Sequence, residues 1–475
     1  MTDVLIIGAG VVGSAIAREL SKYELDITVV EKCSDIAEGV TKANSGIIHA
    51  GYNEKIGTLK GKLNKEGNKM FDSLSKDLDF KFERNGALVL GFSKGDMVIL
   101  EELKKNGEEL GIRDLSILNK EDTLNLEKNI KENVKGALYA KTSGIVSPYE
   151  MTIALAENAA LNGARFKLNS EVTGIEKVDG YYRVKLKNGE EIEAQIVINA
   201  AGLYGDKINN MVSNNTLKVK GVKGEYVLLD KVSGKLTNKT LFTVPRKDTK
   251  GVLVTKTIEG NLLVGPNAKE LDDIFDFSAT EEGISEIKSK GLDLINEIPE
   301  KRILTAFSGI RPHINSDFII EEAKDSKNFI NVIGIDSPGL TCAPAIAVYV
   351  KELLKDKIEL KEDTRFNGKR KGILRFNELS FEEKNEVIKE NRAYGKLICK
   401  CELITEGEII DAINRPLGAK TVDGVKRRTR ASMGGCQGVG CLIPIATIIS
   451  RELDIPLDRV MKNNENSNII GFKED

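Results

Sequence analysis

The beginning of the chain alternates apolar runs with one glycine-rich turn. Residues 3–7 form an apolar run of strand length, and Gly8-Ala9-Gly10-Val11-Val12-Gly13 follows directly. Residues 14–23 carry apolar side chains at helical spacing, and residues 27–30 form a β-branched run that ends on Glu31. This order predicts a strand, a tight turn, a helix and a parallel strand, which together make a β-α-β unit opening at residue 3.

Further along, the apolar periodicity predicts a larger α/β unit. Helical spacing covers residues 56–78, 150–161 and 340–354, and strand-like runs cover residues 86–91, 172–175, 182–186, 192–198 and 329–333. Residues 220–320 alternate strand-like runs with Gly, Asn and Asp turns, which indicates a mostly antiparallel sheet. Residues 356–395 are dense in charge, and we interpret them as a linker with one short helix at 380–391. This linker should leave a compact final module at 396–461 separable.

Composition narrows the class of protein. The chain has 475 residues, 41% hydrophobic and 30% charged, which is typical of a water-soluble protein with more than one core. The net charge of −2 argues against a nucleic-acid-binding protein, because no basic excess is present to neutralise phosphates. No apolar run reaches the ~18 residues that span a bilayer, and the N-terminus lacks the features of a signal peptide. We therefore expect a cytoplasmic protein, free or attached peripherally to a membrane.

The glycine-rich turn has the arrangement of a dinucleotide-binding loop. Its three glycines allow a sharp turn, close approach of the backbone to a pyrophosphate, and close packing of the helix on the strand. Glu31 lies 18 positions after Gly13, near the ~20 expected for the acid that binds an adenosine ribose. The negative charge of Glu31, at the end of the second predicted strand, disfavours the 2′-phosphate of NADP. The choice between FAD and NAD stays open at this point.

The six cysteines divide into two groups. Cys33 and Cys342 stand alone, and we interpret them as small core residues, whereas Cys399, Cys401, Cys436 and Cys441 crowd into the C-terminal module. The spacing of these four, C-x-C and then C-x4-C after 34 residues, favours an iron–sulfur cluster held by four thiolates. Structural zinc remains the alternative, although it usually uses C-x2–4-C at both ends. Lys426, Arg427, Arg428 and Arg430 either offset the thiolate charge or form a solvated basic face.

The segment Thr41-Lys42-Ala43-Asn44-Ser45-Gly46-Ile47-Ile48-His49-Ala50-Gly51 resembles the flavin-contacting segment of FAD-dependent glycerol-3-phosphate oxidases and dehydrogenases. That group belongs to the D-amino-acid-oxidase-like flavoproteins. Further matches follow in the family's order, at residues 198–204, 250–254, 260–266, 307–312 and 337–341. The resemblance covers about residues 1–355, and L-2-hydroxyglutarate oxidases share much of it. The cysteine-rich module resembles the ferredoxin-like, BFD-like [2Fe-2S] domain appended to the large subunit of anaerobic glycerol-3-phosphate dehydrogenase.

The resemblance implies an α/β fold with a Rossmann-like FAD-binding domain, a mostly antiparallel substrate domain and a small [2Fe-2S] module. The FAD-binding parts would cover about residues 1–80, 145–215 and 326–355, and the substrate parts about residues 81–144 and 216–325. The FAD-binding residues would be Gly8, Gly10, Val12, Gly13, Glu31, Thr41, Lys42, Ser45, Gly46, Ile47, Val172, Gly202, Gly339, Leu340 and Thr341. The helix that begins at Gly339 can turn its positive end to the flavin, or Ser337 can simply cap it.

Two residues carry the expected chemistry. Oxidation of an alcohol needs a base, and an imidazole with a pKa near ~6.5 suits that role, so His49 is the candidate base. It competes with the commoner role of a core histidine. Arg311 presents a planar fork to phosphate or carboxylate, although a surface salt bridge is the ordinary alternative. The resemblance places both residues at the catalytic site and adds Ser45, Lys250 and Ser337 as substrate contacts. His313 either assists there or is structural.

Together these features predict an FAD-dependent dehydrogenase that oxidises sn-glycerol 3-phosphate to dihydroxyacetone phosphate. Hydride would pass to flavin N5, and electrons would pass through the [2Fe-2S] cluster to a partner redox subunit or a quinone. A first alternative is an L-2-hydroxy-acid dehydrogenase of the 2-hydroxyglutarate type, in which Arg311 holds a carboxylate. A second alternative is an electron-transfer subunit without a substrate of its own.

Overall fold

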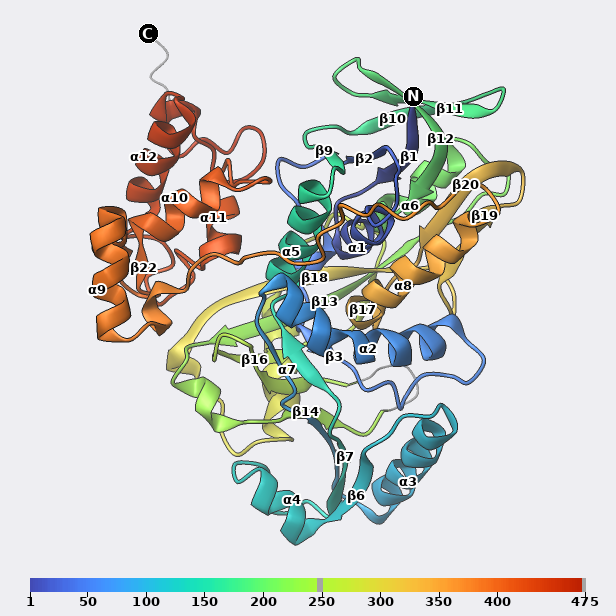
Figure 1. The fold of residues 1–475 in the computed structure, drawn as a ribbon. Helices are drawn as coiled ribbons and strands as arrows, with labels where there is room; N and C mark the ends of the chain where they lie inside the picture. The colour runs from blue at the N-terminus through green and yellow to red at the C-terminus, as the bar shows by residue number, and fades with distance from the viewer. Residues whose placement is uncertain (246–250, 472–475) are drawn as a thin grey trace.

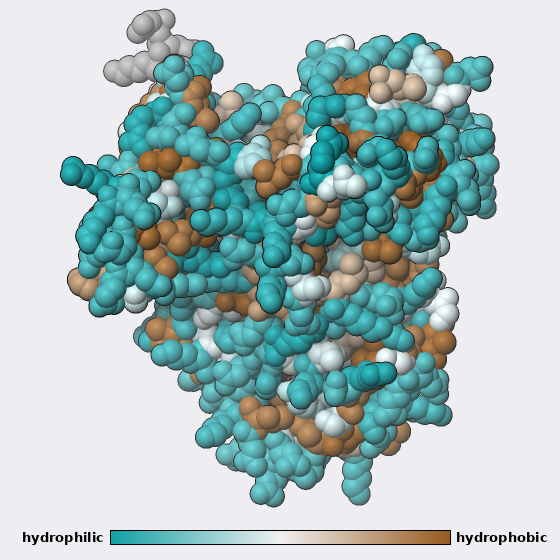
Figure 2. All heavy atoms as spheres, in the orientation of Figure 1, coloured by the Kyte–Doolittle hydropathy of each residue, from teal (hydrophilic) through white to brown (hydrophobic). Residues whose placement is uncertain are grey.

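The computed structural model describes residues 1–245 and 251–471. Two large β-sheets, each with its own helices, form the body of the molecule, and a small helical module that begins near residue 396 lies beside α5 (Figure 1). Hydrophilic residues predominate on the face drawn in Figure 2, with apolar residues in small scattered patches. None of the helices within the described ranges is both long and apolar enough to cross a bilayer.

The first sheet contains the predicted β-α-β unit. Strands β1 and β2 are parallel, with Val4 opposite Ile27, and α1 connects them. The strand order is β10-β11-β12-β1-β2-β9, and β20 joins the end of β12 and also pairs with β19. The strands are β1 (Thr2–Ile7), β2 (Ile27–Val30), β9 (Arg165–Lys167), β10 (Val172–Val178), β11 (Tyr181–Leu186), β12 (Glu191–Asn199), β19 (Ile319–Ala323) and β20 (Ser326–Ile333). The strands predicted in this part of the chain are confirmed.

Helices on one face of this sheet enclose the largest apolar core. They are α1 (Val11–Leu20), α2 (Leu59–Leu78), α5 (Pro148–Leu161) and α8 (Gly339–Leu354), and α1 packs against both α5 and α8. Fully buried Ile6, Ile16 and Ile346 belong to this core. The opposite face is covered by a second apolar cluster with α6 (Gly205–Asn210). A sheet buried on both faces explains why its central strands read as continuous apolar runs.

The second sheet is mostly antiparallel, as the turn pattern predicts. Its order is β17-β13-β16-β15-β14-β5-β7-β6, with β18 beside β13, and among the described residues only the β14–β5 pairing is parallel. The strands are β5 (Ala87–Gly91), β6 (Leu115–Asn119), β7 (Gly136–Ala140), β13 (Lys220–Leu229), β14 (Thr240–Thr243), β15 (Leu253–Lys256), β16 (Leu262–Gly265), β17 (Lys269–Leu271) and β18 (Ile303–His313). Helices α3 (Lys94–Glu109), α4 (Lys120–Leu126) and α7 (Glu281–Leu292), which the sequence analysis does not predict, belong to this part. A small sheet of β3 (Ile47–Ile48), β8 (Gly144–Val146) and β4 (Phe82–Glu83) connects the two parts.

The C-terminal module has its own apolar core. It contains β21 (Leu397–Cys399), β22 (Ile404–Thr405), α10 (Glu406–Asn414), α11 (Val422–Thr429) and α12 (Leu442–Leu453), and Ile409, Val425 and Ile445 are fully buried between them. Cys399 and Cys441 lie in the same core. The module therefore has the compact apolar packing that the sequence pattern indicates.

The charged segment at 356–395 contains the expected helix, α9 (Phe381–Glu390), but it is not a free tether. Arg370, only 8% exposed, donates to a carboxylate oxygen of Glu157 at 2.5 Å, and Arg415 of the module donates to the same carboxylate at 2.9 Å. Arg375 forms an ion pair with Glu150. Two arginines of the segment, Arg370 and Arg375, are thus paired with carboxylates of α5 rather than with water, and the separability of the module stays a prediction.

Candidate active site

A cavity of about 720 Å³ opens where the first sheet meets the second. Its walls come from the turn after β1, the end of β2, the segment that leads into β3, the start of α8 and the strand β18. Most of the residues predicted from the sequence line it, namely Gly8, Gly10, Val12, Glu31, Thr41, Lys42, Ser45, Ile47, His49, Val172, Gly202, Arg311, Ser337, Gly339 and Leu340. Lys250 lies outside the described residues. The fold thus brings residues that are far apart in the sequence together around one cavity.

At two positions of the glycine-rich turn, only glycine fits. Gly8 has φ +106°, and a Cβ on it would lie 2.5 Å from the carbonyl oxygen of Ala200. A Cβ on Gly13 would lie 1.9 Å from the carbonyl oxygen of Gly8, so this residue sets the close packing of helix on strand rather than lining the cavity. Gly10 faces the cavity, where a Cβ would meet only the Thr41 hydroxyl at 3.3 Å. The bare backbone at Gly10 is the feature that a pyrophosphate needs.

Two side chains hold this turn in place. Glu31 accepts hydrogen bonds from the backbone N–H groups of Ala9 at 2.8 Å and of Cys33 at 3.0 Å. Burial raises the pKa of the Glu31 carboxyl, and these two bonds oppose that effect. Thr41 accepts from the N–H of Val11 at the start of α1, at 3.0 Å. The acid expected to bind a ribose therefore also orders the loop that would hold the phosphates.

His49 follows β3 and is held by its backbone at the cavity wall. Its N–H donates to Thr341 Oγ1 at 3.0 Å, and its carbonyl accepts from Asn68 Nδ2 at 2.9 Å and Asn64 Nδ2 at 3.3 Å. The imidazole ring lies 6.1 Å from the ring of Phe242, centroid to centroid. His49 lines the cavity instead of the apolar core, which favours the interpretation as a base.

Arg311 lies on β18, opposite Val222 of β13. Its guanidinium donates to the carbonyl oxygens of Asn267 at 2.9 Å and Val222 at 3.4 Å. Within residues 1–245 and 251–471, no carboxylate oxygen lies within 4.0 Å of it. These carbonyls fix the side chain at the cavity wall without neutralising it, which leaves its positive charge available to bind an anion. The alternative of a surface salt bridge is not observed among the described residues.

The start of α8 contributes backbone rather than a side-chain cap. Gly339 and Leu340 line the cavity, and Pro338 occupies the capping position without a side-chain hydrogen bond, so the alternative in which Ser337 caps the helix is not observed. Thr341 is fully buried and does not line the cavity, and its hydroxyl instead bonds the backbone of His49. The positive end of the α8 dipole can stabilise negative charge on a bound ring.

The sequence analysis misses some residues at the cavity and assigns others differently. Cys33, expected in the core, lines the cavity, and burial with the nearby Glu31 raises the pKa of its thiol to about 12. Gly46 has φ +66°, and a Cβ there would lie 2.4 Å from the carbonyl oxygen of Val146, so it permits close packing. His313 bonds Asp336 at 2.9 Å, a structural role. Lining residues without a local sequence signal include Tyr226, Phe242, Asn267, Phe277 and Asn464.

The cysteines of the module come together in pairs. The Cys401 and Cys436 thiols are close enough to affect each other's pKa, and so are the Cys441 and Cys399 thiols, while all four cysteines are free of disulfides. Backbone N–H groups of Gly440 and Gly438, together with the Cys401 thiol, lower the pKa of Cys436, whereas burial raises the pKa of Cys441 to about 12. Across the described ranges, no three His, Cys, Asp or Glu side chains are grouped so as to hold a single metal ion. Two thiol pairs with converging amides are instead compatible with a two-iron cluster.

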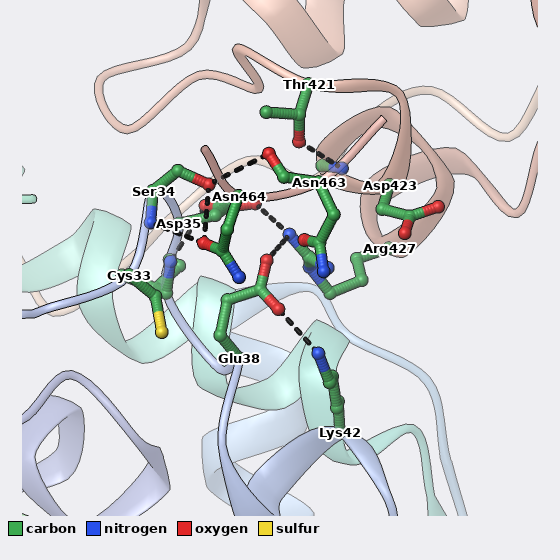
Figure 3. Close-up of polar contacts among 12 residues, drawn as sticks. Cys33, Ser34, Asp35, Glu38, Lys42, Thr421, Asp423, Arg427, Asn463 and Asn464 are labelled. Carbon is green, nitrogen blue, oxygen red and sulfur yellow. Dashed lines mark hydrogen bonds and ion pairs between the residues drawn. The ribbon is translucent and has the colours of Figure 1, made fainter. Parts of the chain in front are cut away.

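Three of the four basic residues before Cys436, the arginines, have neither of the two expected roles. The side chains of Arg427 and Arg428 are buried and form ion pairs with Asp35, in the loop after β2, at 2.8 and 2.7 Å, and Figure 3 shows the pair of Arg427. Arg430 forms an ion pair with Glu402 at 3.1 Å and donates to Asn261 of the second sheet at 3.1 Å. They therefore fix the module on the rest of the molecule, and local spacing could not reveal partners hundreds of residues away.

Comparison with known proteins agrees with this geometry. Residues 3–353 match the family described as FAD dependent oxidoreductase. The chain belongs to the FAD dependent oxidoreductase family. Residues 397–451 of this oxidoreductase match the BFD-like [2Fe-2S] binding domain, so FAD and a [2Fe-2S] cluster are its cofactors. The cavity with its bare loop at Gly10 fits the first, and the paired cysteines fit the second.

Individual relatives of this FAD dependent oxidoreductase extend the comparison. A glycerol 3-phosphate dehydrogenase of Caloramator mitchellensis is 50% identical over 99% of this chain and 98% of its own length. The structure of dithionite-reduced L-α-glycerophosphate oxidase from Mycoplasma pneumoniae, with FAD bound, is 33% identical with a TM-score of 0.73, covering 78% of this chain and 98% of that one. Human mitochondrial L-2-hydroxyglutarate dehydrogenase is 31% identical over 59% of this chain and 64% of its own length.

Proposed function

We propose that this oxidoreductase oxidises sn-glycerol 3-phosphate to dihydroxyacetone phosphate. The observation that carries the proposal is that His49 and an arginine with no described carboxylate partner, Arg311, face the same cavity as the nucleotide-binding loop. The 50% identity with a glycerol 3-phosphate dehydrogenase along almost the whole chain supports the choice of substrate. The fork of Arg311 would hold the phosphate, with Ser45 and Ser337 beside it and Lys250 as a second cation.

In this proposal the residues of the chain bind the substrate and move its proton. His49 accepts the proton of the C2 hydroxyl at an imidazole nitrogen, and the Thr341 and Asn68 bonds to its backbone keep the ring at the cavity wall. Arg311 positions the anionic end of the substrate, which keeps the C2 hydroxyl within reach of His49. When bound, FAD supplies the acceptor for the hydride, and the cluster supplies a one-electron acceptor.

The contact between Tyr149 and Met433 supports electron transfer between the two parts of the chain. Tyr149 lies in the first turn of α5, and its hydroxyl meets Met433 Sδ at 3.6 Å. Val146, just before that helix, donates to the carbonyl of Gly46 in the predicted flavin segment at 2.9 Å. Met433 precedes Cys436 by three residues. A continuous packed route thus connects the predicted flavin segment with the cysteine loop.

We further propose that the electrons leave the cluster for a partner redox protein or for a quinone at a membrane surface. Cys401 is exposed. Three exposed apolar residues lie within three positions of a cluster cysteine, namely Leu403, Val439 and Ile443. Val439 is 90% exposed, so an apolar side chain stands in solvent between two of these cysteines in the sequence. This edge of the module is where an acceptor could approach the cluster.

Anaerobic reduction of the purified holoenzyme tests the substrate assignment. Glycerol 3-phosphate should bleach the flavin absorbance, and His49→Asn should slow that step by ~10²-fold or more, the scale of losing a general base. His313→Asn is the matched control, because His313 is the other histidine and does not line the cavity. Bleaching by L-2-hydroxyglutarate and not by glycerol 3-phosphate would favour the hydroxy-acid alternative. The similarity to the human L-2-hydroxyglutarate dehydrogenase is the reason to test that substrate. Bleaching by neither would favour an electron-transfer subunit.

Replacement of one cysteine tests the cluster. Cys436→Ser should lose both irons and both sulfides of a [2Fe-2S] cluster while glycerol 3-phosphate still bleaches the flavin, because Cys436 does not line the flavin cavity. Turnover with a one-electron acceptor should fall. Cys342→Ser, at a fully buried position in another core, should keep its iron. Zinc without iron in anaerobically prepared protein would contradict the assignment.

A further inference from the structure

A loop near the end of the chain reaches the nucleotide cavity from the C-terminal module. It follows the short helical turn Leu457–Arg459 and closes on itself, with the Lys462 N–H bonded to the Ser467 carbonyl at 2.8 Å and the Ser467 hydroxyl bonded to the Asn464 carbonyl at 2.6 Å. Asn464 lines the 720 Å³ cavity together with Glu31 and Cys33. The match to the FAD dependent oxidoreductase family ends at residue 353, so Asn464 lies outside the part of the chain that the family shares.

The amide of Asn464 is oriented by Ser34. Its Oδ1 accepts from the Ser34 N–H and from the Ser34 hydroxyl, both at 3.1 Å, and the Ser34 hydroxyl also bonds the Asn463 carbonyl at 3.4 Å. With the oxygen committed to these donors, the two N–H bonds of Nδ2 point away from Ser34, toward the side where Cys33 and Glu38 lie (Figure 3). Asn464 and Glu31, the acid expected at the ribose, line the same cavity, and Ser34 follows Glu31 by three residues.

A chain of buried ion pairs connects the same cavity to α11. Lys42, which lines the cavity, pairs with Glu38 at 2.6 Å, and the other oxygen of Glu38 pairs with Arg427 at 2.6 Å. Arg427 also pairs with Asp35 (Figure 3), and Arg428 pairs with the same carboxylate. The side chains of Glu38, Asp35 and Arg428 are at most 4% exposed. A lysine predicted to contact FAD therefore shares its carboxylate with an arginine of the iron–sulfur module.

We propose that the C-terminal module completes the adenosine end of the FAD site, with Asn464 as a further FAD-binding residue, and that FAD binding and module docking stabilise each other. The Asn464 amide donates to a ring nitrogen of the adenine or to a ribose oxygen, chemistry that Glu31, as an acceptor, cannot supply. A negative dinucleotide near Lys42 changes the field at Glu38 and hence at Arg427. Because coupling between two binding events is reciprocal, the factor by which module docking raises the affinity for FAD is also the factor by which FAD favours the docked module. This inference is independent of the substrate.

The first test is FAD affinity in full-length protein, measured by titrating apoprotein and following flavin fluorescence. Asn464→Asp keeps the oxygen that Ser34 requires and removes the N–H donors, so the Kd for FAD should rise about tenfold, the scale of one lost hydrogen bond. Asn466→Asp makes the same change in charge in the same loop, at an exposed position that does not line the cavity, and should bind like the wild type. Equal affinity of the two variants would overturn the role of Asn464.

The second test is the coupling itself. Arg427→Gln removes the ion pairs to Asp35 and Glu38 and should weaken FAD binding, whereas Arg451→Gln removes ion pairs that stay within the module and should not. FAD should slow amide hydrogen exchange in α11 of the wild type, and it should slow it less in Arg427→Gln. The cluster absorbance of each variant checks that the module stays folded. Exchange in α11 that does not respond to FAD would refute the coupling.

Discussion

The hydroxyl of Thr341, in the first turn of α8, accepts a hydrogen bond from the backbone N–H of His49 at 3.0 Å. The two residues are 292 positions apart, and Thr341 is fully buried. The same hydroxyl bonds the carbonyl of Ile47 at 3.4 Å, so one side chain holds the short strand that carries the candidate base. The start of α8 therefore fixes the position of the His49 backbone.

Thr341 should consequently act as a positioning residue for the base. Thr341→Val keeps the shape of the side chain and leaves the buried N–H of His49 unpaired, at a cost of ~1–3 kcal/mol. We expect anaerobic flavin reduction to slow roughly tenfold, with the pH profile of the step unchanged because His49 remains the base. Thr341→Ser retains the hydroxyl and should restore most of the rate. A Thr341→Ser rate as low as that of Thr341→Val would assign the effect to packing instead.

Arg311→Lys should weaken substrate binding more than it slows chemistry. Lysine keeps the charge and loses the fork, which removes at least one charge-assisted hydrogen bond, worth ~1.5–3 kcal/mol, so the Kd should rise ~10–100-fold. Single-turnover reduction rates against substrate concentration separate binding from chemistry. Arg302→Lys, at a half-exposed pair with Asp230 away from the cavity, is the matched control. A lower rate at saturation with unchanged affinity would place Arg311 in another role.

Substitutions of two glycines in the nucleotide loop should have two different effects, one on stability and one on FAD binding. Gly13→Ala places a Cβ 1.9 Å from the Gly8 carbonyl oxygen and should lower the free energy of unfolding by ~1–3 kcal/mol or more through overpacking. Gly10→Val should fold and bind no FAD, because its side chain points into the cavity where the pyrophosphate must approach. Thermal unfolding and flavin content distinguish the two. Gly95→Ala, where the nearest atom is 3.7 Å away, should change neither.

The contact between the module and the first sheet should weaken in acid. Burial by itself would raise the pKa of Asp35, but Arg428 and Arg427 outweigh it and hold this pKa at about 2. A carboxyl with a lowered pKa contributes stability that is fully present above the unfolded-state pKa of ~3.9 and is lost as the pH falls toward 2. The contribution is about 2 kcal/mol.

Comparison of wild type and Asp35→Asn by urea unfolding between pH 6 and pH 3 measures this contribution. The stability difference should be largest at pH 6 and shrink below pH 4, because the unfolded chain then takes up a proton at Asp35 that the folded chain, with its lower pKa, does not. Asp423→Asn, in an exposed pair with Lys462 within the same module, is the control and should show a smaller dependence. A difference that stays constant down to pH 3 would contradict the ion-pair account.

The sequence by itself determines the elements that depend on near neighbours. The strand, turn, helix and second strand at residues 2–30 follow from periodicity and from glycines whose conformation is fixed locally, and the structure places them as predicted. The mostly antiparallel character of the second sheet follows from its turn residues. The motifs that resemble the flavoprotein group indicate the cofactor for a similar reason, because the chemistry of each is contained in a few adjacent residues.

Tertiary structure alone decides which distant charges and amides meet. Nothing near Arg427 and Arg428 in the sequence shows that Asp35, more than 390 positions away, neutralises them, and so they resemble a solvated basic face. Asn464 likewise gives no local signal, and it reaches the cavity only because the module docks beside α5. Periodicity reports which side chains avoid water, whereas the partner of a buried polar group depends on how whole domains pack. The module's place at the flavin site is therefore a property of the folded chain.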